Sequence, residues 1–364
     1  MTTGSILIVG GYGVVGSRIA ADLATDFPDG VVVAGRNQER ADARAAEIGH
    51  GVRGRRIDIT QPATIDAALE NVSIAVNCID QPERGLLRAA VKRGLAYTDI
   101  APHLTELGRG AAYERIHAAA TESGARILLG AGIAPGISNV MVRALADKIG
   151  GATSIETALL LSADDVMGPG SFDYMLQELT MSFDTHVDGT DRRMRAFTAP
   201  RIVDFPPPVD ARRAYLFPFS DQVLYPRTLG ARTVETRLAI TPARISRLLA
   251  LLVTTRATHL VATPPVRAVL GRIRRDCAGR PDALYAVRVD VTHNDRTAHA
   301  TLTGLGQAHA TATSTAALVR SLDDGEISQP GAWMPEQVIT PARFFTRLAA
   351  AGLQVAMSDP VPAR

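Results

Sequence analysis

Three glycines near the N-terminus have the spacing of a dinucleotide-binding turn. They follow the apolar run Ile6 to Val9 as G-x-G-x-x-G and precede the amphipathic stretch Ser17 to Ala24. Between a strand and a helix, such glycines permit a tight turn, let the backbone approach a pyrophosphate and let the helix pack on the strand. The helix N-terminus then faces the phosphates. We therefore expect a dinucleotide to bind at Gly11, Tyr12, Gly13, Val14, Val15 and Gly16.

Basic residues follow the next apolar run, Val31 to Ala34. NAD-binding proteins usually place an acid there to bind the ribose 2′-hydroxyl. This chain instead has Arg36, then Asn37, and Arg40 one helical turn later. Planar guanidinium groups suit a 2′-phosphate. The pattern favours NADP(H) over NAD(H), while the alternative is that both arginines only belong to the solvated start of a helix.

Strand and helix signals alternate through the first third of the chain. This alternation is typical of a doubly wound α/β fold, with a parallel sheet and helices on both faces. The expected strands are Ile6 to Val9, Val31 to Ala34, Gly54 to Ile59, Ser73 to Ile79, Ala96 to Ile100 and Arg126 to Leu129. The expected helices after the first are Arg40 to Ile48, Pro62 to Leu69, Glu83 to Arg93 and Leu104 to Ser123.

Ligands of such sheets bind at the carboxyl ends of the strands. These ends add six candidate cofactor-binding residues, namely Asp58, Asn77, Cys78, Ile79, Gly132 and Pro135. Asp99 is the first candidate for substrate binding or proton transfer, and His103 and Asp80 are the next. A loop or helix-capping role is the alternative for Asp99, and a surface position is the alternative for His103. Cys78 has no adjacent base in the sequence that would make it a nucleophile.

The pattern changes after Thr153 to alternating apolar and polar residues, which indicates a largely antiparallel open sheet. The expected strands are Ile155 to Leu161, Thr233 to Ile240, Tyr285 to Thr292 and Arg296 to Leu302. The last two flank Asn294, a tight-turn residue. Expected helices are Ser171 to Phe183, Pro242 to Arg274 with a break at Pro264, and the alanine-rich Gly306 to Leu322. An open sheet offers a surface for a homodimer.

Composition excludes several classes of protein. The 364 residues carry a formal net charge of only +2, and the arginines are scattered, so nucleic acid is not an expected partner. Cys78 and Cys277 lie far apart without metal-ligand spacing, so we expect no disulfide framework and no metal. The most hydrophobic run, Leu248 to Val253, is too short to cross a bilayer. We expect a cytoplasmic protein that acts on a small molecule.

Eight segments resemble the saccharopine dehydrogenase-like oxidoreductases. They are Ile6 to Gly16, Val31 to Asn37, Ala75 to Asp80, Ala96 to Pro102, Gly130 to Met141, Thr303 to Ala308, Asp323 to Val338 and Phe344 to Leu348. The resemblance implies an NAD(P)-dependent dehydrogenase. Its Rossmann domain would comprise residues 1–132 and 304–364, and an inserted α/β domain for substrate binding and dimerisation would comprise residues 133–303.

Members of this family interconvert an amine and an imine. The resemblance thus implies hydride transfer to a C=N bond formed from an amine and a carbonyl compound, or the reverse oxidation. The region 162–232 resembles the family poorly and shows no recognisable arginine pair for a dicarboxylic substrate. Cations there are Arg192, Arg193, Arg195, Arg212 and Arg213. Two alternatives stay open: an enoyl or carbonyl reductase for an apolar, lipid-like or secondary-metabolite substrate, and an NADP-binding redox sensor without turnover.

Overall fold

The chain folds into two compact units in a computed structural model, which describes residues 4–81, 83–100, 112–163, 179, 181–258, 263 and 283–363. Unit 1 comprises Met1–Val140 and Ala308–Ala351, and unit 2 comprises Met141–Gln307 and Gly352–Arg364. The C-terminal segment thus differs from its expected place in the Rossmann domain. The reason is that its two short strands, β16 (Ala356–Met357) and β17 (Val361–Pro362), pair with a strand of unit 2.

Unit 1 contains a seven-stranded parallel sheet in the order β15-β6-β5-β4-β1-β2-β3. The strands are β1 (Ser5–Val9), β2 (Val31–Gly35), β3 (Arg53–Arg56), β4 (Val72–Asn77), β5 (Ala96–Asp99), β6 (Arg126–Leu128) and β15 (Gly331–Trp333). Every residue of β1 and β2 is buried, as expected for strands covered on both faces. The predicted doubly wound sheet is confirmed, and β15 extends it with a segment from the C-terminal part of the chain.

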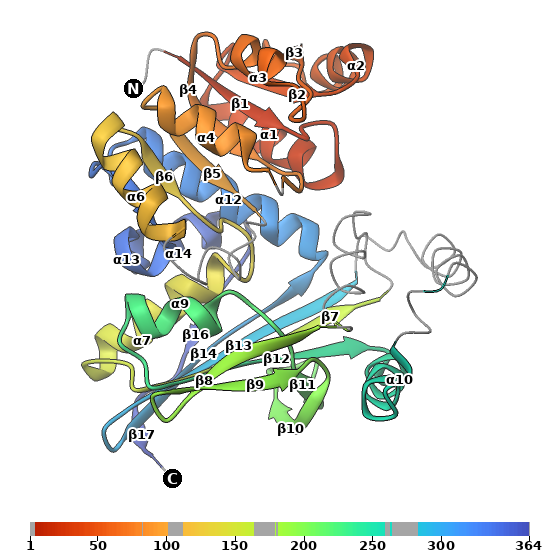
Figure 1. The fold of residues 1–364 in the computed structure, drawn as a ribbon, viewed down its shortest axis with the longest axis vertical. Coiled ribbons are helices and arrows are strands. Elements are labelled where there is room, and N and C mark those ends of the chain that lie inside the picture. The colour runs from red at the N-terminus through yellow and green to blue at the C-terminus, as the bar shows by residue number, and fades with distance from the viewer. Residues whose placement is uncertain are drawn as a thin grey trace. The chain divides into compact units, whose positions relative to one another are not determined.

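Helices connect these strands and cover the sheet (Figure 1). They are α1 (Val14–Asp26), α2 (Gln38–Ile48), α3 (Pro62–Ala68), α4 (Gly85–Lys92), α6 (Ala112–Ser123), α12 (Gln307–Asp323), α13 (Pro335–Val338) and α14 (Pro341–Ala350). A further helix, α7 (Ile137–Ile149), begins in unit 1 and continues into unit 2. The alanine-rich α12 is buried along most of its length, because short side chains allow close packing.

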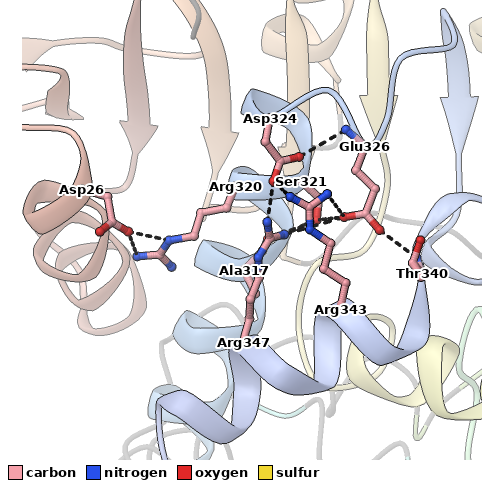
Figure 2. Close-up of polar contacts among 9 residues, drawn as sticks. All are labelled: Asp26, Ala317, Arg320, Ser321, Asp324, Glu326, Thr340, Arg343 and Arg347. Atoms are coloured by element: carbon pink, nitrogen blue, oxygen red, sulfur yellow. Dashed lines mark hydrogen bonds and ion pairs between the residues drawn. The ribbon is translucent and has the colours of Figure 1, made fainter.

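An arginine network attaches α12 to its neighbours in unit 1 (Figure 2). Arg320 of α12 donates from Nε to Oδ2 of Asp26 at 2.7 Å, at the end of α1. Arg347 of α14 donates from Nη1 to Oγ of Ser321 at 2.6 Å and also pairs with Asp324. These contacts join the C-terminal helices, drawn in blue, to the first helix of the chain, drawn in red (Figure 1).

Unit 2 is built on a second sheet in the order β10-β11-β12-β7-β13-β14-β16. Its strands are β7 (Ser154–Ser162), β8 (Ser182–Val187), β9 (Thr190–Arg195), β10 (Thr198–Asp204), β11 (Ala211–Leu216), β12 (Thr233–Thr241), β13 (Leu284–His293) and β14 (Arg296–Leu305). The prediction of a largely antiparallel sheet is confirmed, although β7 and β12 pair in parallel. The predicted turn at Asn294 is present, since Asn294 has φ 53° and the flanking His293 and Arg296 are partners in the ladder.

The region between β7 and β12 differs most from expectation. Phe183 was expected at the end of a helix but lies in β8, which pairs with β9, and residues 171–178 and 180 of that expected helix lie outside the described residues. The two helices described in this unit besides α7 are α9 (Asp221–Thr228) and α10 (Ala243–Thr254). The helix expected from Pro242 to Arg274 ends at Thr254 in the structure, with Thr255 as its C-cap, and residues 259–262 and 264–274 lie outside the described residues. No helix among the described residues is long and apolar enough to span a membrane.

Candidate cofactor site

Backbone atoms crowd the glycines of the turn between β1 and α1. Gly10 has φ +81°, and a Cβ on Gly16 would lie 2.4 Å from the carbonyl oxygen of Gly10. A Cβ on Gly11 would lie 2.7 Å from the carbonyl oxygen of Ile8. Gly13 is less crowded, since its Cβ would lie 3.1 Å from the oxygen of Gly10. The turn is therefore a bare backbone cradle of the kind that a pyrophosphate approaches closely.

Helix α1 begins directly after this cradle, with Gly13 as its N-cap. No side chain caps the helix, and no acidic residue lies in its first turn. Val14 at its first position is 40% exposed, although it is a large apolar residue. The first N–H groups and the positive end of the helix dipole are thus available to an anion. These features fit the phosphates of a dinucleotide.

Tyr12 and Arg40 form a stack beside the end of β2. The guanidinium carbon of Arg40 lies 4.6 Å from the centroid of the Tyr12 ring. The same ring covers Gly35, where a Cβ would lie 2.2 Å from Cε1 of Tyr12. Asn37 caps α2, because its Oδ1 accepts a hydrogen bond from the Arg40 amide at 2.8 Å. Tyr12, Arg40 and Asn37 therefore shape one end of the predicted site, and Asn37 does so through its side-chain cap on the start of α2.

Three charged residues gather at the carboxyl ends of β2 and β3. Hydrogen bonds from the hydroxyl and amide of Thr60 lower the pKa of the Asp58 carboxyl, and the nearby charges of Arg36 and Arg56 lower it further. Arg56 pairs in register with Gly35, which directly precedes Arg36. The sequence prediction did not include Arg56, although its place at the end of a strand could have identified it. Asp58 is mainly a turn residue, since its Oδ1 accepts both bonds from Thr60.

The end of β4 contributes buried polar atoms. Asn77 is 2% exposed and donates from Nδ2 to the carbonyl oxygen of Ile79 at 2.7 Å. Its buried Oδ1 has no hydrogen-bond partner within the described part of the chain. Burial and the charge of Asp99 raise the pKa of the Cys78 thiol to about 12. Cys78 therefore stays protonated at neutral pH and is a poor nucleophile, in agreement with the sequence analysis.

Asp99 lies at the end of β5, where it is 3% exposed. Its Oδ1 accepts a hydrogen bond from the Gly130 amide at 3.0 Å, and its Oδ2 accepts one from the Tyr97 hydroxyl at 3.2 Å. Tyr97 is itself fully buried, which raises the pKa of its hydroxyl, and Gln81 also contacts it. Both oxygens of Asp99 thus have donors from the protein, an arrangement that holds the Gly130 loop in place.

The loop from Gly130 to Gly136 is held at two further points. The hydroxyl of Thr315 on α12 donates to the carbonyl oxygen of Ala131 at 3.0 Å. Asn139 accepts at Oδ1 from the Gly136 amide at 2.8 Å and donates from Nδ2 to Glu336 at 2.7 Å. Glu336 has no exposed surface. Helices α12 and α13 therefore help to position this loop, a role for which the sequence had offered no specific signal.

The structure brings most of the predicted cofactor residues to one edge of the parallel sheet. Gly10 to Gly16 follow β1, Arg36 follows β2, and Cys78 follows β4. The loop that contains Gly132 and Pro135 follows β6. Asp80 is exposed just beyond β4 and has a polar partner of its own. His103 lies outside the described residues.

A comparison with known protein families matches the part of unit 1 that runs from β1 to β6. Residues 6–128 match the family model for the saccharopine dehydrogenase NADP binding domain. No curated protein matches this chain. The fold is similar to apo saccharopine dehydrogenase (L-Glu forming) from Saccharomyces cerevisiae, with a TM-score of 0.66 and 14% identity, over 98% of this chain and 100% of that chain.

A second solved structure shares a smaller region with this chain. The 3-ketoacyl-(acyl-carrier-protein) reductase from Brucella melitensis, complexed with NADH, is 21% identical. That match has a TM-score of 0.27 and covers 35% of this chain and 73% of that chain. Of these two structures, the yeast protein shares the fold of both units, since the match covers 98% of this chain.

Proposed function

We propose that the protein is an NADPH-dependent reductase of C=N bonds, because residues 6–128 match the family model for the saccharopine dehydrogenase NADP binding domain. Its substrate would be an imine formed from an amine and a carbonyl compound. The observation that carries the proposal is the bare glycine cradle, with two arginines beside it at the ends of β2 and β3. The cradle fits a dinucleotide, and the arginines fit its 2′-phosphate.

The proposed selectivity for NADP(H) rests on charge at the adenosine end of the site. The charges of Arg36 and Arg56 both lower the pKa of Asp58, and Arg56 pairs in register with Gly35, the residue before Arg36. Guanidinium groups bind phosphate through paired hydrogen bonds, and each charged hydrogen bond is worth about 1.5–3 kcal/mol. Arg40 lies on the Tyr12 ring and offers a flat cationic surface beside them. The NADH ribose has no phosphate for these groups to bind.

The proposed acceptor is supported by the fold of the whole chain. The yeast protein that shares this fold is a dehydrogenase named for saccharopine, a secondary amine. In the proposed direction, the imine carbon accepts a hydride, the nitrogen accepts a proton, and the products are an amine and NADP⁺. When bound, the cofactor supplies the hydride, and the chain must orient the reactants and manage one proton.

We assign Asp99 the role of a positioning residue, because both of its oxygens hold groups of the protein. It fixes the Gly130 loop beside β6 and the Tyr97 hydroxyl beneath the site. Asp80 and His103 remain predicted candidates for proton transfer. Direct binding of substrate by Asp99 also stays a prediction.

The cofactor assignment is tested with purified full-length protein by isothermal titration calorimetry. We expect Arg36→Gln and Arg56→Gln each to weaken NADPH binding about tenfold or more, because each removes a charged contact. NADH binding should change less than threefold. Arg44→Gln is the matched control, since Arg44 is an exposed arginine of α2 that pairs with Glu47. Equal losses for NADPH and NADH would contradict a 2′-phosphate site.

The reaction class is tested by NADPH oxidation with a panel of acceptors. The panel combines primary amines with aldehydes or keto acids, and includes enoyl esters and isolated ketones. We expect turnover only where amine and carbonyl are both present, together with a secondary amine product detected by mass spectrometry. Turnover of enoyl esters alone would favour the enoyl reductase alternative. NADPH binding without turnover of any acceptor would favour the redox sensor.

A further inference from the structure

A cavity of about 660 Å³ lies between α4 and α6 of unit 1. The lining residues from Arg84, the N-cap of α4, to Lys92 follow the spacing of one helix face. The lining residues on α6, from Ala112 to Ser123, also lie on one face. The volume falls within the range of about 300–1,000 Å³ that is typical of small-molecule sites. None of the predicted cofactor-binding residues lines it.

The floor of this cavity is apolar. Leu87 and Val91 come from α4, where they are 2% and 8% exposed. Ile116 and Ala119 face them from α6, and Ala119 is exposed. These side chains would contact an acyl chain or a ring, so the floor favours a ligand with an apolar part over a bare inorganic ion.

The rim of the cavity is basic. Among the described residues that line it, four are basic, namely Arg84, Arg88, Lys92 and Arg115, and one is acidic, Glu122. The whole chain carries only +2, from 39 basic and 37 acidic residues, so this concentration of charge is local.

The cations of the rim differ in their partners. Arg84 has a polar interaction of its own, whereas Arg88, Lys92 and Arg115 have no ion pair within the described ranges. Long basic side chains can lay their stems on an apolar floor and keep their charged ends at the rim. Guanidinium groups bind carboxylate and phosphate through paired donors.

We propose that the cavity between α4 and α6 is a binding site for a small amphipathic anion, an acyl chain that ends in a carboxylate or phosphate. The chain would lie on Leu87, Val91 and Ile116. The anionic head would bind Arg88 and Arg115, one from each helix. This combination of apolar floor and cationic rim distinguishes the ligand from a neutral lipid and from inorganic phosphate.

The test is calorimetric titration of the full-length protein with decanoate below its micellar concentration. Parallel titrations use decanol, inorganic phosphate and an acidic amphipathic helical peptide. We expect saturable binding of one decanoate per chain, and binding at least tenfold weaker for each other probe. These comparisons use the unaltered protein and do not depend on whether a variant folds.

Two variants locate the site. Arg88→Gln combined with Arg115→Gln should weaken decanoate binding at least tenfold, and Ala119→Trp should also weaken it at least tenfold by occupying part of the cavity. Arg44→Gln on α2 is the control and should bind decanoate normally. Arg36→Gln should also bind it normally, which separates this site from the proposed cofactor site.

Other results would overturn the proposal. Absence of saturable decanoate binding would show that the cavity does not bind the acyl anion. Equal binding of decanol would show that the basic rim does not select an anion. Equal binding of phosphate would show a simple anion site, and preferential binding of the peptide would show a surface for an acidic protein partner. Undiminished decanoate binding by the Ala119→Trp protein would place the ligand elsewhere.

Discussion

A buried carboxyl in unit 2 gives a quantitative prediction about stability. Asp221 begins α9 and is 5% exposed. Its oxygens accept hydrogen bonds from the Thr236 hydroxyl at 2.5 Å and from the Gln222 amide at 3.0 Å. These bonds favour the charged form, but burial outweighs them and raises the pKa of Asp221 from 3.8 to about 6. The folded protein therefore holds this proton more tightly than the unfolded chain does.

The raised pKa sets the sign and size of the effect. Below about pH 4 the carboxyl is protonated in both states and carries no penalty. As the pH rises through 6, the folded state must bury a charge, and stability is lost. A shift from 3.8 to about 6 corresponds to about 3 kcal/mol, at about 1.4 kcal/mol for each pKa unit. Asp221→Asn removes the charge and should recover this free energy at pH 7.5.

Hydrogen exchange of β12 and α9 peptides, followed by mass spectrometry from pH 4 to 8, measures this difference. After correction for intrinsic rates, protection in Asp221→Asn should exceed that of the unaltered protein by about 100-fold at pH 7.5 and by little at pH 4. Asp295→Asn, an exposed position in the same unit, is the control. A difference in protection that does not vary with pH, or faster exchange in Asp221→Asn at pH 7.5, would show that burial of the Asp221 charge does not destabilise the folded state.

Three further variants test the contacts of unit 1. Asp99→Ala should destabilise the protein by about 2–4 kcal/mol in urea unfolding, because two buried donors lose their acceptor. Asp99→Asn should keep more than a tenth of kcat if Asp99 only positions the loop. A 1000-fold loss of kcat in a folded Asp99→Asn protein would instead make Asp99 a catalytic residue. Asn139→Ala should cost about 2–3 kcal/mol by removing its buried hydrogen bonds with Glu336 and with the Gly136 amide, and an unchanged urea midpoint would contradict this. Arg320→Met should lower stability by about 1 kcal/mol, less so in high salt, and a loss independent of salt would argue against an ionic contribution.

The parallel sheet was predictable because its signals are local. The apolar runs before Gly10 and Gly35 are continuous, as expected for strands buried on both faces. The glycines between β1 and α1 have a fixed spacing that follows from close backbone contacts. Helix α12 was also predictable, because its run of small residues is long and uniform.

Other elements depend on partners distant in sequence. Strand β15 has only three residues, and its pairing with β6 is set by the tertiary fold. Strand β9 is largely exposed and rich in arginine, so it has no apolar alternation from which to predict it. The contribution of Glu336 to the loop beside β6 likewise depends on contact with Asn139, which lies 197 residues away. Such contacts give no local pattern in a single sequence.

The preference of the unaltered protein for NADPH over NADH is the decisive property of the proposed cofactor site. The dissociation constants of NADPH and NADH are measured by calorimetry on the same preparation at physiological ionic strength. We expect NADPH to bind at least tenfold more tightly, because the charges of Arg36 and Arg56 near Asp58 would favour the 2′-phosphate. Equal dissociation constants, or tighter binding of NADH, would contradict it.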